Sequence, residues 1–424
     1  MPLRIIIVGA GIAGLAAAVG LARHGHKVQV FERKTTWDET GSGIQLQPNV
    51  SKILEEWGML EEVKKVAHDN EQAALRDHRL GLIAYHDFTQ RGPAWYGLRR
   101  VLKDLFRQFA AKYNVEIHEG VNIVSINQDR PSIILDGGEE ISADLIIGAD
   151  GSGSLVRQTL FPSFPGRKIL DKTVWQISLP LDIVRNDEVL QGLLDGHRNV
   201  ITVAPARSIF ASPSPSQNTY DLQFIDHEYT QAQDPNPAAL TERVRDLSWI
   251  KERFSDFDPA TRKALDLAES AFKWRLVEVF DLPSWSSKNS KVVLLGDACH
   301  AMTPYSGQGT AMGLEDAAVL SELLADIQTS DLGSAIEMYQ NLRRPRCDKV
   351  FNLARAFGTS WSAKDARQIA RRNEVWRKAF EDRDRPVKAD GNAPPGSPAF
   401  GMWLENYNVF EAVRMEKQKR KSKI

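Results

Sequence analysis

The chain has 424 residues, 42% of them hydrophobic, and a formal net charge of -1. A chain of this size can bury a sizeable core in two or three structural units. The near-zero charge excludes a protein drawn to nucleic acid by its overall field, and the basic run at 417–423 is typical of a solvated tail. Two cysteines, Cys299 and Cys347, make neither a disulfide framework nor a zinc site. With no evident targeting signal, they predict a cytoplasmic protein.

The N-terminal segment 5–32 predicts a strand, a glycine turn, a helix and a second strand that ends in an acid. Gly9 permits the tight turn, Gly11 lets the backbone approach a pyrophosphate, and Gly14 allows the helix to pack closely on the strand. The phosphates of a dinucleotide then meet the positive end of the helix. Glu32 is expected to accept hydrogen bonds from the adenosine ribose, and its charge disfavours the 2′-phosphate of NADP.

A membrane span is the alternative for the same segment, because residues 5–22 are an unbroken run of apolar and glycine residues. Three consecutive isoleucines followed by Gly-Ala-Gly favour a strand and a turn over a continuous helix. We therefore expect no membrane span.

Hydrophobic periodicity predicts the remaining elements. Between residues 174 and 225 the chain alternates, and Leu222 and Phe224 fall on one face while Gln223 and Ile225 fall on the other. This indicates a second sheet with one face available to a ligand. Since a buried strand follows at 292–295, the two domains are expected to be interleaved in sequence. The other predicted segments are helices at 48–57, 99–113 and 309–324, strands at 115–118, 121–127, 132–135 and 144–147, and a linker at 386–398.

Two later segments also place a glycine and an aspartate in a turn after a buried strand. The first is 145–151, with Asp150, and the second is 292–298, with Asp297. Asp297 is suited to bind a ribityl hydroxyl, and the helix after Gly309 offers N–H groups to the electron-rich end of a flavin ring. The alternative for each aspartate is a side chain that caps its own turn.

In this order, the Gly-x-Gly-x-x-Gly run at 9–14, the Asp-Gly pair at 150–151 and the Gly-Asp pair at 296–297 resemble the motifs of the class A flavoprotein monooxygenases. This family comprises single-component aromatic hydroxylases such as p-hydroxybenzoate and salicylate hydroxylases. The segment 41–46 and Arg99 also match the family, and the resemblance covers nearly the whole chain. The expected FAD contacts are Gly9, Gly11, Ala13, Gly14, Glu32, Arg33, Ser42, Gly43, Arg99, Asp150, Asp297, Gly307, Gly309 and Thr310.

The resemblance implies an α/β fold in which a Rossmann-type FAD-binding domain is interleaved with a β-sheet substrate domain and followed by a helical region. The expected FAD-binding domain comprises residues 1–70, 97–165 and 288–345, and the substrate domain comprises 71–96 and 166–287. Residues 346–424 are expected to form the C-terminal helical region.

The resemblance also implies the chemistry. FAD is reduced by NAD(P)H as co-substrate, captures dioxygen as a C4a-hydroperoxide, and passes one oxygen atom to an aromatic or other electron-rich small molecule by hydroxylation or epoxidation. Such a peroxide needs a dry site. The chain has no second Gly-x-Gly-x-x-Gly run for the nicotinamide, as expected if the reductant binds transiently near the flavin.

The substrate side departs from the family, because the position of an aromatic–Arg pair reads Trp175-Gln176. Replacing a guanidinium by an amide removes a charge and a bidentate anchor, which favours a neutral substrate. Trp175 is either a site residue or core packing, and Arg207 is either a nearby cation or a hairpin surface charge. The turn beginning at Pro304 is expected to form the opposite wall. His300 lacks a partner at triad spacing, which favours a structural role.

Two alternatives to a hydroxylase remain. One is an FAD-dependent oxidase or reductase of the same fold that inserts no oxygen, and the other is a flavin-containing binding module that holds a partner through its basic tail. The expected partners are a small aromatic molecule and dioxygen, without nucleic acid. The sequence leaves open the substrate, the choice of NADH or NADPH, and whether the protein is a monomer or a homodimer.

Overall fold

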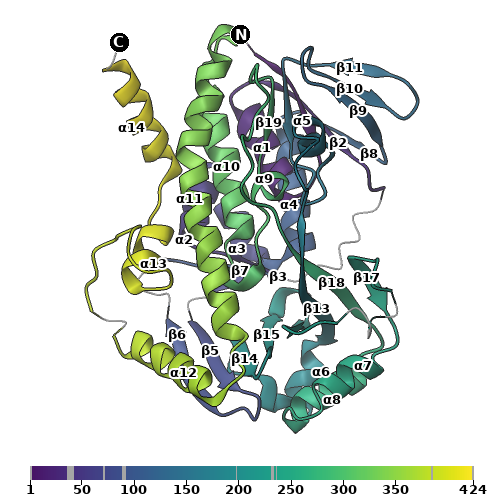
Figure 1. The fold of residues 1–424 in the computed structure, drawn as a ribbon, viewed down its shortest axis with the longest axis vertical. Coiled ribbons are helices and arrows are strands. Elements are labelled where there is room, and N and C mark those ends of the chain that lie inside the picture. Colours follow the sequence, from purple (N-terminus) through teal and green to yellow (C-terminus); the bar gives the residue numbers. More distant parts are fainter. Residues whose placement is uncertain are drawn as a thin grey trace.

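The structure is a computed structural model that describes residues 2–35, 43–69, 72–87, 92–196, 198–230, 234, 236–382 and 385–422. It is organised around a five-stranded parallel sheet and an eight-stranded, mainly antiparallel sheet. Figure 1 shows the parallel sheet in the upper half of the molecule and the large sheet in the lower half. The long helix α11 (Leu332–Trp361) runs beside both.

Three strands of the parallel sheet are apolar and almost completely buried, as is usual for parallel strands. Helix α1 (Ile12–Arg23) packs against α10 (Gly309–Leu324) and α4 (Arg99–Lys112). Three of the strands lie far apart in sequence, so the predicted interleaving is confirmed. In spatial order the strands are β19 (Val292–Leu294), β12 (Leu145–Gly148), β1 (Arg4–Val8), β2 (Lys27–Glu32) and β8 (Glu116–Glu119).

The large sheet has one face in a hydrophobic core with the helices α6 (Leu181–Asn186), α7 (Ser248–Arg253) and α8 (Pro259–Leu267). Its other face looks toward the C-terminal helices. In spatial order the strands are β17 (Thr241–Val244), β18 (Ala271–Glu278), β13 (Lys168–Pro180), β16 (Thr219–Asp226), β15 (Arg207–Ser214), β14 (Asn199–Ala204), β5 (Gln72–Asp77) and β6 (Leu82–Asp87).

The alternation predicted for β16 is confirmed. Leu222 and Phe224 belong to the core with α6, α7 and α8, whereas Ile225 belongs to the cluster on the opposite face. A strand presents successive side chains to opposite faces, so Gln223 and Ile225 lie on the face away from that core.

Smaller elements connect the two sheets. A three-stranded antiparallel sheet contains the predicted strands β9 (Ile123–Asn127) and β10 (Ser132–Leu135) and a further strand, β11 (Glu140–Ser142). Another three-stranded sheet contains β3 (Gly43–Leu46), β7 (Trp95–Leu98) and β4 (His68–Asp69). The short helices are α2 (Pro48–Glu56), α3 (Leu60–Val66), α5 (Leu155–Leu160) and α9 (Asp297–His300).

The C-terminal helices cover both sheets. Helix α12 (Ala366–Glu381) packs against β6, and α13 (Pro398–Glu405) contacts α2. Helix α14 (Val409–Lys421) packs against α10. The segment 385–397 joins α12 to α13 without a helix or strand, as predicted for a linker. Within the described ranges, no helix combines the length and apolarity needed to cross a membrane.

Candidate functional site

A cavity of about 370 Å³ lies where the parallel-sheet unit, the large sheet and the C-terminal helices meet. Turns after the parallel strands contribute Gly11, Ala149, Gly151, Gly296, Asp297 and Gly307. The large sheet contributes Ala73, Leu75, Ile201, Phe210, Gln223 and Ile225. The C-terminal helices contribute Leu353, Phe357, Trp361, Trp376, Phe400 and Leu404. Segments from distant parts of the sequence therefore build one site.

The three glycines of the first turn have different surroundings. Gly9 has a φ of +104°, and a Cβ there would lie 2.5 Å from the Ala149 carbonyl oxygen. A Cβ on Gly14 would lie 2.1 Å from the Gly9 carbonyl oxygen, whereas one on Gly11 would meet nothing within 4 Å. Gly11 and Ala13 line the cavity at the start of α1. The open helix N-terminus fits a pyrophosphate, and the other two glycines hold its shape.

Glu32 braces this turn from the end of β2. Its carboxylate accepts hydrogen bonds from the Ala10 N–H at 2.9 Å and the Lys34 N–H at 2.9 Å. A carboxylate has further acceptor positions, which suits the predicted ribose contact. Neither Glu32 nor Arg33 lines the cavity, whereas Gly43 and Arg99 do. Ser42 lies outside the described residues.

The structure corrects the expected role of the Asp150 side chain. The carboxylate accepts hydrogen bonds from the Ser154 hydroxyl at 2.5 Å and the Leu155 N–H at 2.6 Å, so it caps α5. Burial raises its pKa, and these donors oppose that shift. Its neighbours Ala149 and Gly151 line the cavity, but Asp150 does not. Because the carboxylate caps the helix, this turn presents only its backbone to the cavity.

Asp297 lies on the cavity wall at the first position of α9, after Gly296 at a φ of +62°. Pro304 begins a short 3-10 turn, Pro304–Ser306, that continues the same wall. Gly307, Gly309 and Thr310 follow along the wall into the N-terminus of α10. The expected flavin-side residues from both later turns thus come together, with Asp150 as the exception.

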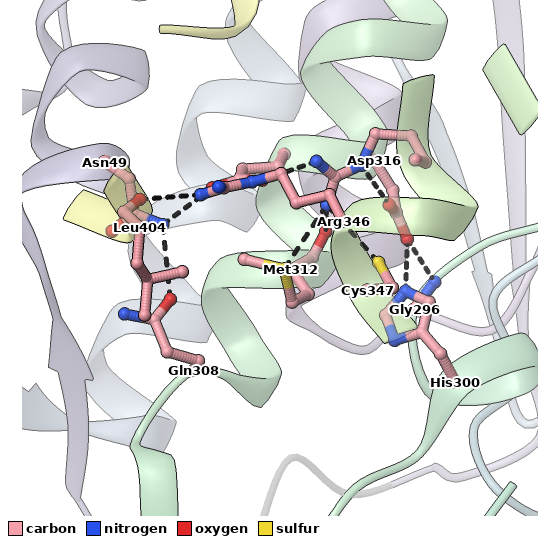
Figure 2. A network of polar contacts seen from close by, with 11 residues as sticks. Asn49, Gly296, His300, Gln308, Met312, Asp316, Arg346, Cys347 and Leu404 are labelled. Atoms are coloured by element: carbon pink, nitrogen blue, oxygen red, sulfur yellow. Dashed lines mark hydrogen bonds and ion pairs between the residues drawn. The ribbon is translucent and has the colours of Figure 1, made fainter. Parts of the chain in front are cut away.

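A buried polar network lies directly behind this wall (Figure 2). The Asp316 carboxylate accepts hydrogen bonds from the Gly296 N–H at 2.9 Å and from Arg343 Nε at 2.7 Å, and lies 2.6 Å from His300 Nε2. Burial alone raises the pKa of Asp316, but the His300 and Arg343 cations outweigh it and lower the pKa to about 2. The charged carboxylate therefore holds the turn that presents Asp297.

The network explains His300 without invoking a metal. Ligand atoms of Cys299, His300 and Asp316 lie within 4.8 Å of one another. The Arg343 guanidinium donates to the same Asp316 carboxylate, and a neighbouring cation opposes binding of a metal ion. A structural role for His300, as expected, agrees with this arrangement.

The other half of the network connects the turns to the C-terminal helices (Figure 2). Glu315 accepts hydrogen bonds from Arg346 Nε at 2.7 Å and Asn49 Nδ2 at 2.7 Å. Arg346 also donates to the Leu404 carbonyl oxygen at 2.7 Å, and Asn49 donates to Gln308 at 3.2 Å. The position of α13 is thereby coupled to the turn that precedes α10.

Only one member of the Trp175-Gln176 pair faces the cavity side of the large sheet. Gln176 aligns with Gln223, which lines the cavity, so both side chains project from the same face. Gln176 donates a hydrogen bond to Asp221, and its own Oε1 is buried without a hydrogen-bond partner. Trp175 lies in the opposite core against Trp249, with ring centroids 5.5 Å apart. The expectation that Trp175 lines the site is therefore wrong.

Arg207 is also turned away from the cavity. Its guanidinium pairs with Asp256 at 2.6 Å, on the strand face that carries Ile209 into the opposite core. Phe210 projects from the other face of β15 and lines the cavity instead. Arg207 therefore stabilises the hairpin and its helices and does not offer a charge to a ligand.

The sequence reasoning missed the aromatic residues that the C-terminal region brings to the site. Phe357 and Trp361 lie at the end of α11, Trp376 on α12 and Phe400 on α13. Aromatic residues at helical spacing are usual in any buried helix face, so the sequence carries no signal that separates these from core residues.

Tyr305 is another lining residue that the sequence did not single out. Its hydroxyl lies 3.1 Å from His227 Nδ1, and the second ring nitrogen of His227 lies 3.0 Å from the Ser208 hydroxyl. Burial, with the nearby charges of Lys172 and Arg253, lowers the pKa of His227 to about 3. The imidazole is consequently neutral at pH 7 and fixes the Tyr305 ring at the wall.

Comparison with known proteins adds family evidence to this geometry. The model of the family described as "FAD binding domain" matches residues 3–354. The chain is 32% identical over 373 residues to the FAD-dependent monooxygenase cfoG of Aspergillus candidus, covering 82% of this chain and 83% of that protein. It is 29% identical over 398 residues to the 3-hydroxybenzoate 6-hydroxylase of Klebsiella oxytoca, covering 88% and 92%.

Solved structures share the fold. A structure of CtdE in complex with FAD and a substrate has a TM-score of 0.82 at 20% identity, covering 98% of both chains. A salicylate hydroxylase substrate complex has a TM-score of 0.77 at 22% identity, again covering 98% of both chains. The similarity extends through the C-terminal helices as well as both sheets.

Proposed function

This chain belongs to the FAD binding domain family, and we propose that it uses FAD, NAD(P)H and dioxygen to hydroxylate or epoxidise an aromatic or other electron-rich small molecule. Its relatives include FAD-dependent monooxygenases and aromatic-ring hydroxylases, which supports a monooxygenase over an oxidase or reductase. The observation that carries the proposal is a single cavity bordered by the glycine turns and by a largely apolar sheet face.

The residues on the turn side fit FAD. The open N-terminus of α1 at Gly11 suits the pyrophosphate, and the Glu32 carboxylate at the end of β2 suits the ribose. Asp297, on the cavity wall, suits the ribityl chain, and the N-terminus of α10 at Gly309 suits the electron-rich end of the ring. When bound, FAD supplies the redox chemistry and activates dioxygen.

The residues of the chain position the substrate and exclude water from the site. Ile201, Phe210 and Ile225 form an apolar floor on the large sheet, and the C-terminal helices cover it. Water exclusion protects a reactive oxygen donor and strengthens each polar contact inside the site. Tyr305, held by neutral His227, joins the floor to the turn at Pro304.

The proposed substrate is neutral. Arg99 is the sole arginine or lysine that lines the cavity among the described residues, and it belongs to the flavin side. An anion buried at the sheet side would lose its hydration without a paired cation. Gln176, on the cavity face behind Gln223, offers an amide where an arginine would attract a carboxylate.

Flavin reduction and isotope transfer test the proposal. We expect the purified protein to be yellow, NADH or NADPH to bleach the flavin without oxygen, and dioxygen to restore it. With ¹⁸O-labelled dioxygen and an accepted substrate, mass spectrometry should find one labelled oxygen atom in the product. Poor substrates should yield hydrogen peroxide instead. Product oxygen derived only from water, or flavin turnover with no oxygen insertion into any ring, contradicts the monooxygenase and supports the oxidase or reductase.

A further inference from the structure

We infer that Gln45 presents a hydrogen-bond donor of fixed direction to the cavity, and that this donor binds an acceptor oxygen on a planar ring, either a flavin carbonyl or an oxygen of the substrate. The inference deepens the proposed function and rests on it, because it takes both rings to occupy this cavity. The buried carboxylate of Glu315 sets the direction through a series of side-chain amides, Asn49, Gln308, Gln47 and Gln45 (the amide chain).

The amide chain connects Glu315 to the cavity wall. Asn49 Nδ2 donates to Glu315 at 2.7 Å and to Gln308 Oε1 at 3.2 Å (Figure 2). Gln308 Nε2 donates to Gln47 Oε1 at 2.6 Å, and Gln47 Nε2 donates to Gln45 Oε1 at 3.3 Å. Asn49 and Gln308 are buried, whereas Gln47 and Gln45 line the cavity. Each donor in the amide chain therefore points away from the acid and toward the cavity.

Glu315 permits one direction only. Burial alone raises its pKa, but the Arg346 and Arg343 cations outweigh burial and lower the pKa. An ionised carboxylate only accepts hydrogen bonds, so Asn49 must turn its NH₂ group to Glu315. The Asn49 Oδ1 atom is consequently buried without a hydrogen-bond partner among the described residues. Because an unpaired buried carbonyl costs free energy, the contact with the acid decides how this amide is oriented.

The orientation then passes from one amide to the next, since each amide has one accepting and one donating end. Asn49 turns an NH₂ group to Gln308, so Gln308 must answer with its oxygen and turn its own NH₂ group to Gln47. Gln47 answers Gln308 in the same way and turns its NH₂ group to Gln45. If Gln45 alone turned over, two NH₂ groups would face each other. The Gln45 atom left for a ligand is therefore Nε2, a donor.

This donor lies beside the turns that we propose hold the flavin. Gln45 is half-buried on β3 and projects from the same strand face as Gly43, which also lines the cavity. A Cβ on Gly307 would lie 2.3 Å from Gln45 Oε1, so the oxygen end of this amide rests against the turn before α10. Within the described ranges, Gln45 Nε2 makes no hydrogen bond. A donor that a bound ligand cuts off from water needs an acceptor on that ligand.

The two sources of the acceptor have different consequences. A donor to a flavin carbonyl binds the electron-rich reduced ring more strongly than the oxidised ring, because hydrogen bonds to charged groups are stronger, and it raises the reduction potential. A donor to a carbonyl or hydroxyl oxygen of the substrate fixes which ring carbon faces the flavin. Gln45 contacts the ligand in both cases, whereas Asn49, Gln308 and Gln47 act as positioning residues.

The reduction potential of ligand-free holoenzyme tests the flavin as the source. It is measured without oxygen, by slow reduction with xanthine and xanthine oxidase beside a reference dye. If a flavin carbonyl is the acceptor, Gln45→Met should lower the ratio of reduced to oxidised FAD at a fixed potential about tenfold, which is about 30 mV for a two-electron couple. Gln308→Met adds no charge and leaves Gln45 able to turn over. It should give a smaller shift in the same direction.

Titration of the oxidised holoenzyme tests the substrate as the source. The probes are acetophenone, whose carbonyl only accepts, and isopropenylbenzene, which has a similar shape without a polar atom. Binding is read from the change in flavin absorption. If a substrate oxygen is the acceptor, Gln45→Met should weaken acetophenone binding about fivefold relative to isopropenylbenzene.

Gln308→Glu should reproduce this loss without a change at the cavity surface. A carboxylate at position 308 requires a donor from Gln47, so Gln47 and Gln45 turn over and an oxygen then faces the cavity. Both probes are neutral, so the added charge affects them alike.

The control variant is Gln340→Met. The Gln340 side chain accepts a hydrogen bond from the Trp285 N–H at 2.8 Å and does not line the cavity. Its loss should change neither the potential nor the ratio of the two probe affinities. The inference is overturned if Gln45→Met also changes neither, or if it changes one of them and no Gln308 variant does. Gln45→Glu keeps the oxygen that faces Gln47 and serves in the titration if the methionine variant misfolds.

Neither assay uses NAD(P)H, dioxygen or product, so the two proposals fail separately. A shifted potential or probe ratio, in a protein that never inserts labelled oxygen, overturns the monooxygenase and keeps the Gln45 donor. Labelled product from the wild-type protein, with both quantities unchanged in Gln45→Met, does the reverse.

Discussion

The flavin side and the substrate side of the cavity are built in different ways. The side proposed for FAD presents glycine backbone, helix N-termini and Asp297, supplied mainly by turns after parallel strands, together with Arg99. The substrate side presents large side chains from the sheet face and the C-terminal helices. Backbone recognition requires particular residues at fixed spacings, whereas an apolar wall accepts many residues of the right size.

The comparison teaches where each kind of specificity resides. A cofactor site made of backbone tolerates few substitutions, because a side chain added at Gly9 or Gly14 would collide with neighbouring main chain. A substrate site made of side chains can change without disturbing that frame. The buried network around Glu315 and Asp316 joins the two and keeps them in register.

The largest expected effect distinguishes Gly11 from Gly14 in the first glycine turn. Gly11→Val should abolish FAD retention and leave the stability of the apoprotein near the wild-type value, because the new side chain enters open space meant for the pyrophosphate. Gly14→Val should lower the melting temperature of the apoprotein itself, since its Cβ would lie 2.1 Å from the Gly9 carbonyl oxygen. Gel filtration followed by visible absorption, with thermal melting of each apoprotein, measures both. A fully yellow Gly11→Val protein contradicts the cofactor site.

The next prediction concerns the buried network around Glu315 and Asp316, which joins the two sides of the cavity. Glu315→Gln should lower the free energy of unfolding by about 3–5 kcal/mol, because it removes the carboxylate that pairs with buried Arg346 and leaves buried Arg343 with Asp316 alone. Glu322→Gln on the same helix is the control, since the Glu322 carboxylate pairs with the partly exposed His24. That change should cost no more than about 1 kcal/mol. Urea unfolding of the holoproteins measures both, and equal losses would show that the buried network does not stabilise the joint.

Two adjacent residues of β13 test the face of the large sheet. Gln176→Arg should improve binding of 6-hydroxy-2-naphthoate by less than about 3 kcal/mol, the upper range for a charge-assisted hydrogen bond. Asp221, which accepts a hydrogen bond from Gln176, competes for the new cation. The gain should therefore grow in the double variant with Asp221→Asn. Trp175→Phe should leave ligand preference unchanged because Trp175 lies in the opposite core. A changed preference in Trp175→Phe alone would reverse our assignment of the faces.

The last prediction concerns acid stability on the substrate side. The folded-state pKa of His227, about 3, lies below its usual value of 6.5. The unfolded chain thus binds the proton more readily, and the stability that neutral His227 contributes is lost as the pH falls from about 6.5 toward 3. The slope from this group is at most about 1.4 kcal/mol per pH unit. His227→Asn should flatten the dependence of unfolding free energy on pH in that window. An unchanged slope would show that His227 does not carry the effect.

The fold could largely be predicted from the sequence. The isoleucine-rich strands and the turn glycines indicated the parallel sheet and its interleaving, and alternation in β16 indicated the open sheet face. The same signals led to most of the flavin-side residues that reach the cavity, including Gly11 and Asp297. Local patterns suffice there because each residue acts through the backbone of its own turn.

The predictions that failed concern residues whose role depends on the direction in which the side chain points. Trp175 and Gln176 could not both face a ligand on one strand, and only the register with β16 shows which one does. Asp150 caps α5, and Arg207 pairs with Asp256 from a helix turn far along the chain. The partners of Trp175 and Arg207 lie far along the chain and are invisible in the local sequence, whereas the donors to Asp150 are close by and the local sequence left both of its roles open.

By itself, the sequence indicated the strands and glycine turns of the parallel sheet and the turns that we propose bind the nucleotide, because glycine conformations and apolar periodicity act over short stretches of chain. Only the tertiary structure decided which strand face meets the cavity and that Trp361, Trp376 and Phe400 reach it from the C-terminal helices. Those residues are brought together by packing between segments far apart in sequence. A side chain acquires its role from the neighbours that packing supplies, and no spacing along the chain records them.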